Sequence, residues 1–235
     1  VYELFGIDLA RELGVTGPLA MIAAVTILYG SIRALSQDDI KARLAYSTVS
    51  QVSYITLGVA LAGPIAAIGA LAHLTHQGVM KITMFMAAGN LAEGFGIKKV
   101  SQMDGIGRVM PGTMTAFTLA ALAMIGLPPF AGFISKWYLA QGGIAVGQDW
   151  VIALLLGSSL LNAAYFLPML HRAWFCDAPE RVAQVPARPR IGVWLTAPPI
   201  ITAGFVVAIG VLANAPFSPL EWVRFIVEAE FDGGL

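Results

Sequence analysis

The sequence predicts an all-α, polytopic membrane protein with six transmembrane helices, one of them broken. Hydrophobic residues make up 57% of the 235 residues and charged residues only 12%, against about 25% charged in a typical soluble domain. A chain this apolar needs lipid as its solvent. No stretch alternates in the way of a transmembrane β-strand, whereas six stretches are long and apolar enough for a helix to cross the hydrocarbon core, which takes about 20 residues. These six stretches are 18–35, 43–61, 65–92, 112–141, 150–174 and 193–213.

The basic residues support six spans and predict the orientation of the chain. Ten of the fourteen Lys and Arg residues fall in loops on one side, and two fall on the other. Lys and Arg concentrate in cytoplasmic loops, so we expect the three basic loops in the cytoplasm of a bacterial or archaeal cell, with the N-terminal end and the acidic C-terminal tail outside the inner membrane. The ten are Arg33, Lys41, Arg43, Lys98, Lys99, Arg108, Arg172, Arg181, Arg188 and Arg190, and the two are Arg11 and Arg224.

The tail 219–231 is predicted to be a short amphipathic helix, because Leu220, Val223, Ile226 and Val227 fall toward one face. Such a helix lies on the membrane surface or contacts a partner.

Charge and cysteine content exclude several classes of protein. The net charge is zero, so neither a nucleic acid nor an acidic substrate is implied. Cys176 is the only cysteine, which excludes an internal disulfide and a cysteine-based metal cluster. The chain opens with Val1 and has no signal-peptide pattern in residues 1–16. We therefore interpret it as a piece of a longer chain, or as a product whose other half is encoded elsewhere.

The two remaining basic residues, Lys81 and Lys136, fall inside spans. A lysine at the centre of the bilayer costs about 3 kcal/mol on insertion scales, and both lie too far from a span end for easy snorkelling. No Asp or Glu lies in the middle of any span. Either a carboxylate partner comes from outside this chain, or the lysines are partly neutral. The expected reason for this cost is an ion or proton path.

The third span places two further titratable groups near Lys81. His73 and His76 are three residues apart and share a helix face. This cluster is typical of a proton relay bridged by water, although hydrogen bonds that merely join helices would use the same residue types. A metal site is not predicted, because no third ligand is evident.

The fourth stretch contains Gly126-Leu127-Pro128-Pro129 in its middle. Pro128 and Pro129 remove two backbone donors and clash with the preceding turn, which predicts a broken helix. Irregular backbone at membrane depth survives only where protein or a water-filled cavity receives it, and transporters use such breaks to bind ions. Lys136 follows two turns later, which argues against a kink used only for packing.

The second span carries a polar stripe over two turns. Such a stripe faces either neighbouring helices or a hydrated path, and both interpretations stay open. Its members are Tyr46, Ser47, Ser50, Gln51, Ser53 and Tyr54.

Three stretches, in this order and spacing, carry a resemblance to a known family: residues 39–51, 73–89 and 126–136. Together they resemble the antiporter-like membrane subunits shared by Mrp-type cation/proton antiporters, respiratory complex I and membrane-bound hydrogenases. The resemblance covers residues 1–175, and the last span and tail match in character only.

The resemblance implies a domain organisation. Members of this family have about fourteen spans with two inverted five-helix repeats. Residues 1–175 would be the second repeat, and residues 176–235 a cytoplasmic loop, the last transmembrane helix and the amphipathic C-terminal tail. The missing first repeat would supply a glutamate and a lysine. Lys136, with Trp137 and Gly142-Gly143, looks more like the D-type subunit of Mrp antiporters.

The resemblance also implies a function, which is transport rather than enzymatic catalysis. The expected protein is the C-terminal half of a membrane subunit of a multisubunit monovalent cation/proton antiporter, with protons passing along Lys136, Lys81, His76 and His73. Its partners would be the lipid bilayer, the other subunits, protons and Na⁺ or K⁺; no cofactor, metal or nucleic acid is expected. The supporting polar or broken-helix residues would be Pro128, Pro129, Tyr46, Ser50 and Gln51.

Two alternatives remain. The same module serves redox-driven proton pumps, as in an NADH-quinone oxidoreductase or a membrane-bound hydrogenase. A non-transporting structural subunit could also use such polar residues for packing alone.

Overall fold

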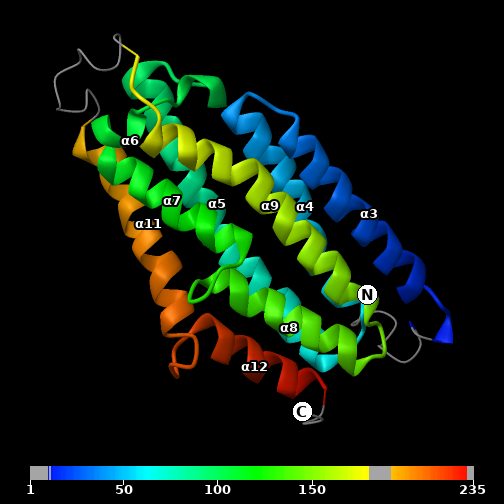
Figure 1. Cartoon of the computed structure of the whole chain (residues 1–235). Helices are drawn as coiled ribbons and strands as arrows, with labels where there is room; N and C mark the ends of the chain where they lie inside the picture. The colour runs from blue at the N-terminus through cyan, green and yellow to red at the C-terminus, as the bar shows by residue number, and fades with distance from the viewer. Residues whose placement is uncertain (1–9, 11, 180–191, 232–235) are drawn as a thin grey trace.

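The computed structural model describes residues 10, 12–179 and 192–231, and within them the chain is helical without any strand. The helices form an elongated bundle (Figure 1). Four of the basic residues used above for orientation, Arg11, Arg181, Arg188 and Arg190, lie outside the described residues. The helices are α3 (Thr16–Leu35), α4 (Ile40–Ala60), α5 (Pro64–Phe95), α6 (Ile106–Val109), α7 (Pro111–Ile125), α8 (Ala131–Ala145), α9 (Trp150–Phe175), α11 (Val193–Val211) and α12 (Pro219–Glu230).

The helices fall where the sequence predicted spans. By length and composition, α3, α9 and α11 are apolar enough to cross a membrane. Helices α4 and α5 have 21 and 32 residues but carry the polar stripe and the His–Lys cluster, and α7 is a shorter apolar helix of 15 residues. The prediction of an all-α, polytopic membrane protein is confirmed.

The predicted break in the fourth span is confirmed, and a glycine makes it possible. Helix α7 ends at Gly126, whose φ of +96° lies in the left-handed region that glycine enters without steric cost. Pro128 and Pro129 follow, and α8 begins at Ala131. The sequence therefore converts one long apolar stretch into two half-helices, each of 15 residues.

Two glycines let neighbouring backbones approach this break closely. A Cβ atom on Gly132 of α8 would lie 1.9 Å from the carbonyl oxygen of Ala123 in α7. A Cβ atom on Gly210 of α11 would lie 2.3 Å from the carbonyl oxygen of Pro129. Helix α11 thus packs directly on the break and fixes its position.

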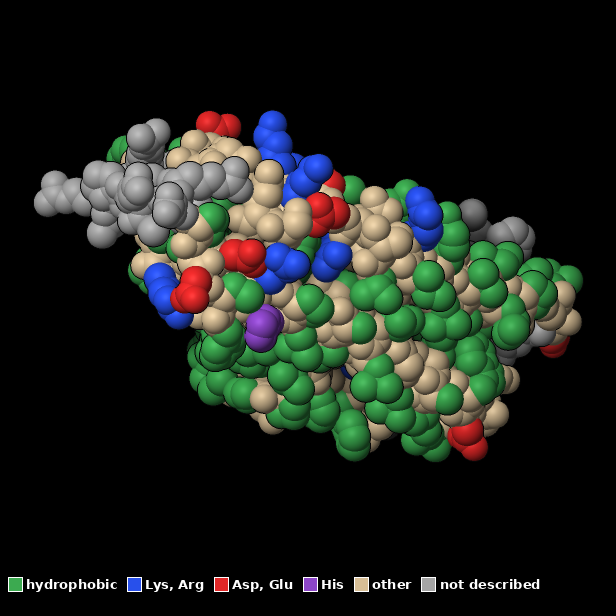
Figure 2. Space-filling view, turned by 45° about the horizontal axis from the view of Figure 1, so that its top comes forward, with side chains coloured by type: hydrophobic (Ala, Val, Ile, Leu, Met, Phe, Trp, Pro, Cys, Tyr) green, Lys and Arg blue, Asp and Glu red, His purple; other side chains and the backbone are tan. Residues whose placement is uncertain are grey.

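Charged residues gather at one end of the bundle. Figure 2 shows most Lys, Arg, Asp and Glu side chains along one edge of this face, with hydrophobic side chains covering much of the rest. At this end Asp38 accepts hydrogen bonds from the backbone and the hydroxyl of Ser101, and the hydroxyl bond lowers the pKa of the Asp38 carboxyl group. Arg172 pairs with Asp104 at 3.0 Å. These contacts connect the segment that follows α5 to the loop between α3 and α4 and to α9.

The predicted amphipathic tail helix is present as α12 (Pro219–Glu230). Leu220, Val223 and Val227 are buried, and α12 packs against α5, with the guanidinium of its Arg224 donating to the Tyr138 hydroxyl of α8. Ile226, at the edge of the predicted apolar face, is 52% exposed. The outward face of α12 is therefore apolar too, with Trp222, Phe225 and Ile226 all exposed.

We predict that Gly69→Ala weakens the bundle whereas Gly78→Ala in the same helix does not. A Cβ atom on Gly69 would lie 2.6 Å from the backbone nitrogen of Leu139 in α8, while nothing lies within 4 Å of a Cβ atom on Gly78. Overpacking of this kind costs about 1–3 kcal/mol, and an unhindered Gly→Ala change in a helix is neutral or stabilising by up to about 1 kcal/mol. Thermal unfolding of the purified protein measures both. Equal melting temperatures for the two variants would contradict the close approach of α5 and α8.

Candidate ion path

The ammonium group of Lys136 lies at the broken end of α7. From α8, its Nζ donates to the carbonyl oxygens of Met124 and Ile125 at 3.0 and 2.9 Å and to the Ser159 hydroxyl of α9 at 3.0 Å. The last carbonyls of a helix have no partner within it, and they form the negative end of the helix dipole. The break therefore supplies this buried charge with oxygen acceptors. The ring of Tyr54 in α4 lies 5.6 Å from Nζ.

Lys81 is held by a smaller set of oxygens. Its Nζ donates to the Ser47 hydroxyl at 2.6 Å and to the Leu44 carbonyl oxygen at 3.3 Å, both in α4, and lies 5.9 Å from the centroid of the Phe166 ring. In the described parts of the chain, neither Lys81 nor Lys136 is in an ion pair with a carboxylate. This agrees with the lack of mid-span acids noticed in the sequence.

A continuous chain of hydrogen bonds joins the two lysines through α9. The Ser47 hydroxyl lies 2.8 Å from the Tyr165 hydroxyl, which donates to Asn162 Oδ1 at 2.6 Å. Asn162 Nδ2 donates in turn to the Met124 carbonyl oxygen at 3.1 Å. That carbonyl is the same one that accepts from Lys136.

The directions of these bonds determine what the chain can do. The Tyr165 hydroxyl donates to Asn162, so the Ser47 hydroxyl donates to Tyr165 and accepts from Lys81. Every donor therefore points from Lys81 toward Met124. An amide such as Asn162 accepts on its oxygen and donates from its nitrogen, so this chain orients and polarises its members but does not pass a proton onward at Asn162.

His73 lies between the half-helix α8 and the polar stripe of α4. Its Nδ1 is 2.8 Å from the Ser135 hydroxyl and its Nε2 is 3.1 Å from Gln51 Oε1. Its ring stacks on that of Tyr54 at 5.0 Å between centroids. Since Ser135 precedes Lys136, the imidazole lies beside the helix that carries this lysine.

His76 is buried with no hydrogen-bond partner on either ring nitrogen, and Gln51 Nε2 and Gln77 Oε1 are unpartnered as well. Buried polar groups are normally satisfied by protein or by ordered water, and buried waters typically bind several such groups. The two histidines are therefore not joined to the lysines by direct hydrogen bonds, and these unpartnered atoms are acceptors and donors available to water.

The structure divides the polar stripe of α4 between two neighbours. Tyr46 and Ser50, predicted as supporting residues, contact α3 instead of the lysines: the guanidinium of Arg33 lies 5.4 Å from the Tyr46 ring, and Ser50 bonds the hydroxyl of Ser31 at 2.9 Å. Gln51 reaches the site through His73. The stripe therefore faces neighbouring helices, with Tyr46 and Ser50 toward α3 and Gln51 toward His73.

Sequence reasoning missed the contribution of α9. Ser159, Asn162 and Tyr165 all bond to members of the site. The signal was present, because polar residues at spacings of three and four in an apolar span share one helix face. Ser158 belongs to the same face and accepts from the Tyr54 hydroxyl at 2.6 Å.

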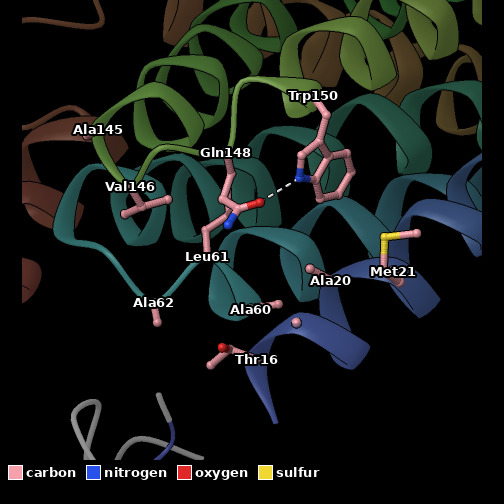
Figure 3. Close-up of a pocket in the computed structure, with 11 residues that line it drawn as sticks. Thr16, Ala20, Met21, Ala60, Leu61, Ala62, Ala145, Val146, Gln148 and Trp150 are labelled. Carbon is pink, nitrogen blue, oxygen red and sulfur yellow. Dashed lines mark hydrogen bonds between the residues drawn. The ribbon is translucent and has the colours of Figure 1, made fainter. Parts of the chain in front are cut away.

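A pocket of about 590 Å³ lies at the end of the bundle where α3 begins and α8 ends (Figure 3). Trp150 Nε1 donates to Gln148 Oε1 at 2.7 Å beside it, and its lining combines apolar side chains with polar atoms. Neither Lys81 nor Lys136 lines this pocket. The two lysines are enclosed by helices instead.

The fold and site define a class: polytopic membrane proteins with an interrupted helix and buried cationic side chains beside it. Residues 8–162 match the family described as "NADH:quinone oxidoreductase/Mrp antiporter, TM". This match covers more than half of the chain, so the protein belongs to that family and is an antiporter-like membrane subunit.

Curated relatives come from both branches of the family. The chain is 44% identical over 162 residues to the N-type subunit of the NADH-quinone oxidoreductase of Desulforudis audaxviator, covering 69% of this chain and 32% of that one. It is 33% identical over 154 residues to the D-type subunit of the Na(+)/H(+) antiporter of Bacillus subtilis, covering 65% of this chain and 31% of that one. The chain thus spans about a third of the length of these relatives.

Solved structures match nearly the whole chain. A chain of the Mrp complex from Dietzia sp. superposes with a TM-score of 0.86 at 24% identity, covering 99% of this chain and half of that one; at that identity the likeness concerns the fold alone. A chain of respiratory complex I from Thermus thermophilus superposes with a TM-score of 0.82 at 26% identity, covering 97% and 48%.

We predict that Tyr165→Phe destabilises the protein by about 1–3 kcal/mol, the cost of leaving buried polar groups without a partner. The change removes the hydroxyl that connects Ser47 to Asn162 and keeps the ring. Tyr29→Phe is the matched control, because the Tyr29 side chain is 57% exposed. Thermal unfolding of both variants checks this, and equal stability would argue that the hydrogen-bonded chain through α9 contributes nothing.

Proposed function

We propose that this chain translocates protons as a membrane subunit of a multisubunit monovalent cation/proton antiporter. The observation that carries the proposal is the pair of buried lysines without a carboxylate partner in the described chain, one of them at the end of an interrupted helix. Charged groups inside a bilayer are costly and mark ion or proton pathways, and interrupted helices place ion sites at the midplane.

The proposed path runs from Lys136 to Lys81 past His73 and His76. His73 lies beside the helix of Lys136 through Ser135, and the unpartnered nitrogens of His76 offer sites for water. Water is needed because no direct hydrogen bond joins a histidine to a lysine among the bonds described above. The chain through Asn162 would keep the two lysines oriented while water and imidazole carry the proton.

The proposed unit is the second five-helix repeat, residues 1–175, followed by a cytoplasmic loop, a closing helix and the tail. Its partners would be the first repeat, which the longer relatives have room for, and the other subunits of the complex. The proposed sidedness puts the basic loops in the cytoplasm, as the distribution of Lys and Arg favours.

A redox-driven pump is the second candidate, and a specific observation favours it. The identity to the N-type subunit of an NADH-quinone oxidoreductase, 44%, exceeds the 33% to the D-type subunit of an antiporter. The proton path would be the same, and the driving reaction would lie in other subunits. Proton flux that responds to a Na⁺ or K⁺ gradient in the absence of an electron donor supports the antiporter, whereas flux that requires NADH or another donor supports the pump.

We predict that Lys136→Ala in the full complex lowers cation-driven proton flux by at least about tenfold, which corresponds to about 1.4 kcal/mol or more on the barrier. The variant removes the only ammonium held at the broken helix in the described chain. Lys41→Ala is the control, since Lys41 is exposed near the start of α4. Flux is measured in proteoliposomes with a pH-sensitive dye, and unchanged flux in Lys136→Ala at equal protein content would remove this residue from the path.

A further inference from the structure

The oxygens around Lys136 have the arrangement of a cation site. Three of them, the Met124 and Ile125 carbonyl oxygens and the Ser159 hydroxyl, lie at 2.9–3.0 Å from one nitrogen atom. All three belong to buried or half-buried groups of packed helices, and the two carbonyls are fixed by the end of α7. We call this set of three oxygens the α7 cage.

We propose that the α7 cage binds a dehydrated monovalent cation of about the size of ammonium, in exchange for the proton of Lys136. The proposal rests on the proposed exchange of a cation for protons and adds where the cation binds. Backbone carbonyls at helix breaks and at half-helix C-termini coordinate monovalent cations in transporters, and rings of carbonyls replace the hydration shell of K⁺ in channels. The α7 cage presents the same chemistry, and the side-chain ammonium occupies it.

The distances favour a large monovalent ion. Oxygen ligands hold Ca²⁺ at about 2.3–2.6 Å and Mg²⁺ at about 2.0–2.1 Å, which is well inside the 2.9–3.0 Å of the α7 cage. The absence of any carboxylate ion pair to Lys136 in the described chain also disfavours a divalent ion. An ion such as K⁺ or Rb⁺ matches both the spacing and the single charge that the site already holds.

The exchange balances in charge and in protons. When a cation enters the α7 cage, Lys136 releases one proton to the path and becomes a neutral amine, whose lone pair is a further ligand. The net charge of the site stays at +1, so the exchange adds no second buried charge and no second desolvation penalty. Proton and cation exclude each other from one set of oxygens, which gives an antiporter its one-for-one coupling.

Other titratable groups face Lys136 from two of the helices around it. They are Tyr54 of α4 and His73 of α5. On α9, Tyr165 is the titratable residue nearest in sequence to Ser159 and is bonded to Asn162 and Ser47. Helices α7 and α11 carry no titratable side chain.

Lys81 provides an internal comparison. Its ammonium group has only two oxygen acceptors, at 2.6 and 3.3 Å, and neither lies at a helix end. Removal of Lys81 should therefore leave no cation site, although it removes the same charge from the interior of the same bundle.

The test measures equilibrium binding of ⁸⁶Rb⁺ to the purified complex that contains this chain. Lys136→Ala is expected to bind Rb⁺ more tightly than the wild type at the same pH, because no ammonium group competes for the three oxygens. Lys81→Ala is expected to bind Rb⁺ no more tightly than the wild type. The double variant Lys136→Ala/Ser159→Ala, which lacks one oxygen of the α7 cage, is expected to bind Rb⁺ at least about tenfold more weakly than Lys136→Ala.

A second measurement uses the wild-type complex and needs no variant to fold. Addition of Rb⁺ at low buffer strength should release about one proton per bound ion, seen with a pH indicator, because linked equilibria are reciprocal. Lys136→Ala should bind Rb⁺ without this release. The proposal is overturned if Lys136→Ala binds Rb⁺ no more tightly than Lys81→Ala, or if Rb⁺ binds to the wild type without proton release.

These outcomes are separate from those of the flux experiment. If Lys136→Ala loses proton flux but binds Rb⁺ no more tightly than the wild type, the proton path stands and the α7 cage is not a cation site. If Lys136→Ala binds Rb⁺ more tightly but keeps its flux, the α7 cage is a cation site and Lys136 is not part of the proton path.

Discussion

The arrangement depends on one electrostatic constraint: a positive charge inside a low-dielectric bundle must have acceptors, and this chain offers Lys136 no carboxylate among its described residues. The end of α7 meets that need with the carbonyl oxygens of Met124 and Ile125. Those carbonyls are available only because the helix stops at Gly126. The break, the glycine and the lysine therefore form one unit, and none of them is explained without the others.

This unit sets the packing around it. Helix α8 must approach α7 closely enough for the lysine to reach back across the break, and Gly132 permits that approach. Helix α9 contributes Ser159 to the ammonium and Asn162 to the same Met124 carbonyl. One carbonyl thus accepts from two donors, so the hydrogen bonds of Lys136 and of the chain that leads to Lys81 share one acceptor.

The sequence predicted those features of the site that are energetically unfavourable in a membrane or that lie within one segment of the chain. Long apolar runs, paired prolines and lysines within spans are each visible within one segment of the chain, so the spans and the break could be predicted. The sequence could not predict which helix each residue of the α4 stripe faces. Ser47 and Ser50 lie about one helix turn apart, and only the packing of α3 and α9 decides that Ser50 contacts α3 and Ser47 contacts α9. The role of Tyr165 was missed for a related reason: the polar residues of α9 share one helix face, but the partner of the Tyr165 hydroxyl is not evident until α4 is placed beside it.

Gly210 gives the C-terminal helices a mechanical role. Since α11 has no side chain at the point where it meets the Pro129 carbonyl, a shift of α11 along its axis presses directly on the turn that joins the two half-helices. A neighbouring protein seated against the outer surface of α11, where Ile201 and Phe205 are exposed, would be one contact layer away from the oxygens that hold the ammonium. Packing on that surface and the geometry at Lys136 are thus physically linked through the contact between Gly210 and Pro129.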